Sequence, residues 1–155
     1  MKYFLMFLGV LLLLGCESDA QSDSIERKTY RFPSAPSIEN TEILEIEEAQ
    51  FSDAAYYPDG VVMVVETQQE LEELYHNLFD NILDPDPIPP DIDFEAYVVI
   101  AALGRNHHTS SEITITEVKP LPSGGFTAQV EAFYGDFGIA AMTKPVHIVK
   151  AKKRA

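Results

Sequence analysis

Two adjacent histidines, His107 and His108, are the side chains of this sequence best suited to proton transfer or metal binding. Imidazole titrates near neutral pH and is a common zinc ligand. Neighbouring residues of a strand point to opposite faces, so the pair binds one metal poorly, and no spacing predicts His76 or His147 as a third ligand. We therefore interpret the pair as part of a solvated loop after Gly104, with no metal and no cofactor.

Serines and paired acids are the other groups that could carry out catalysis. Ser110 and Ser111 follow the histidines, but no Gly-x-Ser-x-Gly motif and no strand–turn–helix pattern surrounds them. Asp84 and Asp86 are separated by prolines, which favours an exposed loop over a pair of catalytic carboxylates. The sequence contains no catalytic signature, and a hydrolase that uses one of the histidines with an acid is the least favoured hypothesis.

The only cysteine, Cys16, marks the end of an apolar segment. Residues 3–15 carry no charge. As a helix they would measure about 20 Å, whereas a bilayer core is about 30 Å thick, so a transmembrane span is not expected. Lys2 before the segment and small residues at its end are typical of a secretory signal.

The end of this segment, Leu13-Leu14-Gly15-Cys16, resembles the bacterial lipobox. In lipoproteins with that motif, the cysteine thiol receives a diacylglyceryl group and the signal peptidase cuts just before the cysteine. A small residue followed by a thiol fits this chemistry. We expect residues 1–15 to be a signal peptide and Cys16 to be the lipid attachment site. An ordinary signal-peptidase site at 18–20 and an unrelated buried cysteine are the two alternatives.

The chain is strongly acidic, with a formal net charge of −14 over 155 residues. Such a charge disfavours nucleic acid and anionic membrane surfaces as partners, because both repel it. Residues 17–40 are rich in Ser, Asp, Glu, Gln and Pro, so we expect 16–40 to be the acylated cysteine and a flexible tether. Residues 41–155 are expected to form a single globular domain without disulfides or cysteine–metal sites.

The expected location follows from the anchor. Acyl chains on Cys16 would hold the protein in the bacterial cell envelope, so the membrane is a partner through the lipid. Glu17, rather than an aspartate, follows the cysteine. By analogy with enteric bacteria, this favours transport to the outer membrane, with the domain on its periplasmic or surface face.

The clearest local pattern predicts a helix over 68–82. Thr67 and Glu70 form a capping box, in which the side chain of each residue accepts a hydrogen bond from the backbone amide of the other. The prolines of 84–90 would stop the helix. Apolar residues follow the cap at three- and four-residue spacing on one helical face: Leu71, Leu74, Tyr75, Leu78, Phe79 and Ile82.

Most of the remaining sequence has strand patterns. Apolar runs or alternation predict strands at 42–47, 61–65, 97–103, 112–118, 126–133 and 139–151. Ile113, Ile115 and, after a one-residue slip, Val118 should face the core. Glycines and prolines predict turns at 58–60, 120–125 and 134–138. The expected fold is α+β, with one capped amphipathic helix packed on a predominantly antiparallel sheet or small sandwich of five to six strands.

Several of these segments together resemble a known family. Asp93-Phe94 leads into the apolar strand 97–104, and the preceding helix carries Glu70, Leu71, Glu73 and Leu74. The closing strand is Thr143-Lys144-Pro145-Val146-His147-Ile148-Val149. Residues 61–152 thereby resemble the PrcB-type C-terminal domain. Where that family has Thr-Gly-Gly-Tyr, this chain has Thr109-Ser110-Ser111-Glu112, so the loop must take another shape. The resemblance implies an envelope domain that associates with and stabilises a secreted protease complex, without enzymatic activity.

The leading hypothesis is therefore a non-catalytic envelope lipoprotein whose domain binds or stabilises a partner protein. Exposed aromatic and polar loop residues would meet that partner, and the candidates are His107, His108, Thr109, Tyr134 and Phe137. The alternative is a small-ligand domain with a pocket between helix and sheet, lined by Met63, Leu78, Phe79 and Met142.

Overall fold

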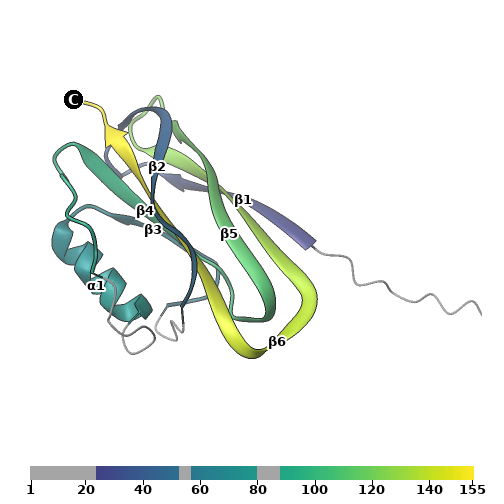
Figure 1. The fold of residues 1–155 in the computed structure, drawn as a ribbon. Helices are drawn as coiled ribbons and strands as arrows, with labels where there is room; N and C mark the ends of the chain where they lie inside the picture. The colour runs from purple at the N-terminus through teal and green to yellow at the C-terminus, as the bar shows by residue number, and fades with distance from the viewer. Residues whose placement is uncertain (1–23, 53–56, 80–87) are drawn as a thin grey trace, which may run out of the picture.

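Two antiparallel β-sheets pack face to face, and helix α1 (Gln68–Phe79) covers the outer face of one of them (Figure 1). The computed structural model describes residues 24–52, 57–79 and 88–155, with the backbone alone at 24, 47–52, 107–110 and 136–143. Sheet A has the order β1–β6–β5, from Ser24–Phe32, Phe126–Lys153 and His107–Pro120. Sheet B has the order β2–β6–β4–β3, with β2 at Ile38–Ser52, β4 at Tyr97–Leu103 and β3 at Val61–Val65. The α+β prediction is confirmed.

Strand β6 belongs to both sheets. Its residues 126–134 pair with β1 and β5, and its residues 144–153 pair with β2 and β4. Between these parts, Gly138 lies opposite Thr109 and Thr143 lies opposite His107, with a shift of register. There β6 bends back on itself at one end of the sandwich (Figure 1). The turn predicted at 134–138 is wrong, because strand pairing continues through these residues.

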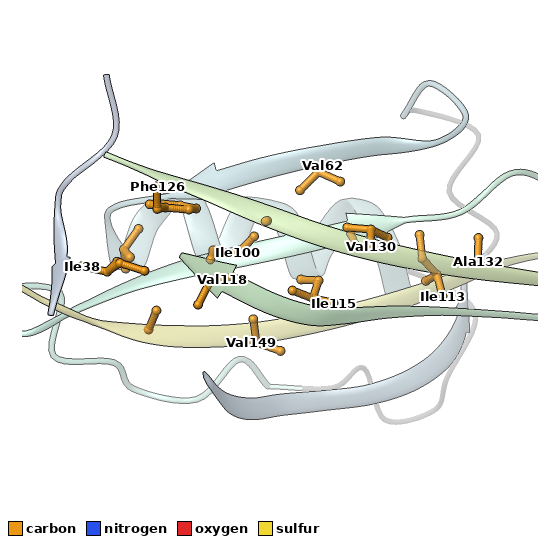
Figure 2. Packing of buried hydrophobic residues seen from close by; sticks show 14 residues of the cluster. Ile38, Val62, Ile100, Ile113, Ile115, Val118, Phe126, Val130, Ala132 and Val149 are labelled. Carbon is orange, nitrogen blue, oxygen red and sulfur yellow. The ribbon is translucent and has the colours of Figure 1, made fainter. Parts of the chain in front are cut away.

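Side chains of sheet B alternate between two hydrophobic clusters. In β4, Val98 and Ile100 contact the cluster between the sheets, whereas Val99 and Leu103 contact the cluster beneath α1. Burial on both faces explains why β4 is a continuous apolar run and not an alternating one. Figure 2 shows the intersheet cluster, with labelled residues Ile38, Val62, Ile100, Ile113, Ile115, Val118, Phe126, Val130, Ala132 and Val149.

Helix α1 begins with the predicted capping box. The Glu70 amide donates to Thr67 Oγ1 at 3.2 Å, and the Thr67 amide donates to Glu70 Oε2 at 3.2 Å. The helix is described as far as Phe79, so the predicted continuation to residue 82 lies outside the described residues. The predicted apolar face is confirmed, with Leu71, Leu74, Tyr75, Leu78 and Phe79 all buried.

The tether prediction is wrong from residue 24 onward. β1 pairs with β6 from Ser24 opposite Tyr134 to Phe32 opposite Phe126. Tyr30 and Phe32 pack against the intersheet cluster, and the Phe32 ring lies 5.3 Å from the Phe126 ring, measured between centroids. Polar residues on both faces of this edge strand gave it the composition of a linker. The two aromatic residues on its inner face fix it to the fold.

The slip predicted near Ile115 is confirmed. Ile113, Ile115 and Val118 are buried, and the register of β5 against β6 shifts between Ile115 and Glu117. The turn predicted at 120–125 is confirmed too. Gly125 has a φ of 72°, and a Cβ there would lie 2.0 Å from the Phe32 carbonyl oxygen, so this position requires glycine.

Candidate functional site

The predicted partner-facing loops are strands in the structure. His107, His108 and Thr109 begin β5, while Tyr134 and Phe137 lie within β6. The loop predictions are wrong because the connection from β4 to β5 takes up only residues 104–106. Its tight path comes from contact with β6, where the Gly104 amide donates to the Pro145 carbonyl oxygen at 2.8 Å.

Of these five residues, only Tyr134 has a side chain that the structure describes. Tyr134 is half-buried, and its hydroxyl accepts a hydrogen bond from the Arg105 amide at 3.3 Å. The Arg105 guanidinium lies over the Tyr134 ring, 5.1 Å from its centroid. Tyr134 therefore supports the β4–β5 connection. The side chains at 107–109 and 137 lie outside the described residues.

Arg105 also binds a carboxylate of β1. Its guanidinium forms an ion pair with Glu26, whose other carboxylate oxygen lies 3.2 Å from Lys28 Nζ. The hydrogen bond from Arg105 holds the pKa of Glu26 below its usual value of 4.5. The group thus links the edge strand of sheet A to the β4–β5 connection, and Glu26 remains ionised at neutral pH.

A small hollow lies beside this charged group. Its volume is about 20 Å³, and residues on its walls include Glu26, Arg105, Tyr134, Ile113 and Val130. That is room for about one water molecule, whereas pockets for organic ligands measure roughly 300–1,000 Å³. The hollow is too small to enclose a substrate of ordinary size.

The predicted pocket beneath the helix is occupied by side chains of the protein itself. Leu78 is 0 % exposed and Phe79 is 1 % exposed, both within the cluster between α1 and sheet B. Met63 packs against the same cluster, while the side chain of Met142 lies outside the described residues. Met63, Leu78 and Phe79 are therefore core residues.

Lys144 is a buried cation that the sequence analysis did not single out. It is 0 % exposed, and its Nζ donates to the Tyr57 carbonyl oxygen at 2.7 Å and lies 3.1 Å from Asp59 Oδ1. The Asn106 amide also donates to Asp59 Oδ1, at 3.3 Å. The hydrogen bond from Lys144 lowers the pKa of Asp59. Lys144 thus fixes the segment before β3 to β6.

His147 joins the two sheets. It is 6 % exposed, and its Nδ1 accepts the Ile115 amide of sheet A at 2.9 Å. Its Nε2 lies 3.0 Å from Glu45 Oε1 on β2. Because Nδ1 accepts from an amide, the ring proton belongs on Nε2, which donates it to Glu45. Both ring nitrogens are therefore engaged in holding strands together.

The sequence contains a weak indication that His147 is buried. In 146–151, His147 shares its face with Val149 and Ala151, and both of these belong to the intersheet cluster. A polar residue on a core-facing position predicts a buried hydrogen bond. The partners, Ile115 and Glu45, are distant in sequence and could not be found from it.

Ser111, one of the two serines considered for catalysis, is buried. It is 7 % exposed, so the interior of the sandwich shields its hydroxyl. Within the described ranges, no three His, Cys, Asp or Glu side chains come together as metal ligands would. In the same part of the chain, no helix has the length and apolar character needed to cross a membrane.

The segment 61–104, which includes α1, carries charge of a single sign. Residues 61–104 contain ten acids and neither lysine nor arginine. The acids of this segment that the structure describes are all exposed, and they are Glu66, Glu70, Glu72, Glu73, Asp91, Asp93 and Glu95. We call these exposed acids the acidic α1 surface. Two lysines of β6 contact the same segment, since Lys150 Nζ lies 4.8 Å from the centroid of the Tyr97 ring and Lys153 Nζ donates to the Phe94 carbonyl oxygen at 2.7 Å.

The chain was compared with known proteins. No family model, curated protein or solved structure matches it.

Proposed function

We propose that the protein is a non-catalytic lipoprotein of the bacterial cell envelope whose sandwich domain binds a partner protein. The anchor is the two or three acyl chains that the lipobox-like Leu13-Leu14-Gly15-Cys16 would direct to Cys16. The resemblance of 61–152 to the PrcB-type domain suggests a secreted protease complex as the class of partner.

The observation that carries partner binding is the acidic α1 surface. The seven described acids of 61–104, with no lysine or arginine within that segment, make the field on this side of the domain predominantly negative. Such a field speeds encounter with a basic protein surface and disfavours acidic ones. The buried cation and imidazole, Lys144 and His147, are engaged in structural bonds and support a binding domain more than a catalytic one.

Metabolic labelling tests the anchor. A clickable fatty acid should label the wild-type chain and leave the Cys16→Ala chain unlabelled, because the thiol is the acceptor. Equal labelling of both chains would contradict the lipoprotein proposal. If an ordinary signal peptidase cuts after the 18–20 site instead, the wild-type chain would carry no label and its mature form would begin after residue 20.

Charge reversal tests the binding surface. The lipidated wild-type protein should recover a stoichiometric basic partner from envelope extracts. Glu72→Lys with Glu73→Lys, both exposed on α1, should reduce recovery about tenfold or more. Glu42→Lys with Glu112→Lys makes the same change of charge on exposed strand residues and should leave recovery within about twofold. Equal loss in both variants would show that net charge, and not this surface, governs binding.

A further inference from the structure

The described fold begins close to the proposed lipid attachment site. Seven residues, 17–23, separate Cys16 from Ser24, the first residue of β1. A fully extended chain spans at most about 3.6 Å per residue, so Ser24 lies within about 29 Å of Cys16. β1 pairs with β6 from end to end, so this connection cannot lengthen unless β1 leaves the sheet.

The start of β1 and helix α1 lie on opposite sides of the domain. β1 is in sheet A, while α1 packs on the outer face of sheet B (Figure 1). Sheets pack about 10 Å apart and a helix is about 10 Å wide, so the far surface of α1 lies about 25 Å from sheet A. A connection of at most about 29 Å exceeds that depth by only a few ångström, so turning α1 toward the bilayer requires 17–23 to be almost fully extended. Turning the outward face of sheet A toward the bilayer requires far less extension and is the favoured orientation.

The outward face of sheet A carries an exposed apolar side chain next to the start of β1. Ile25 is 60 % exposed and lies opposite Phe133 of β6. The next outward pair is Arg27 and Glu131, whose Nε and Oε1 atoms form an ion pair at 2.6 Å. We call these four residues the Ile25 patch. The two charges of the patch cancel, and the exposed acid beside it is Glu112 of β5, opposite Phe133. Zwitterionic lipid headgroups have no net charge to repel this single carboxylate.

We propose that the Ile25 patch rests on the lipid headgroups of the membrane that holds the Cys16 acyl chains, and that α1 faces away from that membrane. This orientation rests on the proposed acylation of Cys16. The short connection keeps the patch within reach of the bilayer, and Ile25 enters the boundary between headgroups and acyl chains. The acidic α1 surface is then the side open to a soluble or envelope partner.

Position-specific labelling of the lipidated full chain tests the orientation. Cys16 is the only cysteine, so once it is acylated an introduced cysteine provides the sole free thiol. Thr29→Cys reports on exposed β1, and Glu72→Cys reports on exposed α1. Each variant is labelled with the same fluorophore and placed in phosphatidylcholine–phosphatidylethanolamine vesicles that carry a headgroup-linked quencher. We expect quenching at least about twofold stronger at position 29 than at position 72.

Flotation of the vesicles separates the possible failures. Chains that float with the vesicles but show equal or reversed quenching would overturn the orientation and leave the anchor standing. Wild-type chains that do not float would overturn the anchor and the orientation together. Ile25→Asp, added to the Thr29→Cys chain, should weaken its quenching while flotation persists. Unchanged quenching in that variant would overturn the contact of Ile25 with lipid.

Discussion

Two buried polar residues, His147 and Lys144, connect strands that hydrophobic contact alone would hold less specifically. His147 binds a β5 amide and a β2 carboxylate, and Lys144 binds the segment that precedes β3. Buried polar groups with satisfied hydrogen bonds specify one arrangement of neighbouring strands, since other arrangements leave these groups without partners. His147 and Lys144 therefore help to specify which strands of the sandwich lie next to one another.

The first prediction concerns the acceptor at His147. His147→Leu should lower the free energy of unfolding by about 2 kcal/mol, because the buried Ile115 amide loses its partner. His147→Asn should cost less, because its amide oxygen can occupy the place of Nδ1. Urea unfolding measures both variants, and hydrogen exchange at the Ile115 amide should be fast only in the leucine variant. Equal exchange in the two variants would contradict the assigned bond.

The second prediction concerns Asp59 and pH. Its pKa is lowered from 3.8 by the hydrogen bond from Lys144, so its contribution to stability is complete at neutral pH and is lost progressively as the pH falls below about 5. At pH 7 we expect Asp59→Asn to be less stable by about 1 kcal/mol, a small value because the carboxylate is half exposed. The difference from wild type should shrink toward pH 3. Asp91→Asn, which also removes one exposed acid, is the matched control for the change in net charge.

At the scale of elements, the chain from 24 to 32 matters most, because its composition is that of a tether while its structure is a strand. β1 supplies Tyr30 and Phe32 to the intersheet cluster and carries Glu26 to Arg105. The same strand leaves Ile25 on its outer face. One element therefore both completes sheet A and determines how near the domain lies to its anchor.

The third prediction tests that β1 belongs to the fold. Phe32→Ala should lower the free energy of unfolding by about 2 kcal/mol, because Phe32 is partly buried against Phe126. Arg31→Ala changes the exposed neighbour and should stay within about 0.5 kcal/mol of wild type. Urea unfolding monitored by circular dichroism distinguishes the two. A negligible effect of Phe32→Ala would restore the tether interpretation for this segment.

At the scale of the whole molecule, charge is unevenly balanced, with 25 acidic residues against 11 lysines and arginines. Self-repulsion on this scale opposes the compact state. Our fourth prediction is that the thermal unfolding midpoint at pH 7 rises when ionic strength increases from about 0.01 M to 0.15 M. Over that range the Debye length falls from about 30 Å to about 8 Å. The midpoint of the variant with Glu72→Lys and Glu73→Lys should rise less. A fall in the wild-type midpoint would contradict the prediction.

Local patterns predicted those elements whose neighbours along the chain supply the cause. The capping box at Thr67 and Glu70 makes its bonds within four residues, and the alternation around Ile113 requires only that one face be buried. The predictions that placed candidate site residues in loops were wrong. The loops expected at 107–109 and 134–137 are strands, because pairing between distant residues overrides the turn preference of Gly135 and Gly138.

The sequence by itself determined the helix, most of the strands, the acidic character of the chain and the lipobox-like motif at Cys16. Each of these depends on residue type and short spacing. Tertiary structure alone decided that β6 serves two sheets, that His147 meets Ile115, and that β1 leaves only residues 17–23 before the fold. The physical reason is that strand pairing and burial join residues far apart in sequence, where no local pattern records the partner.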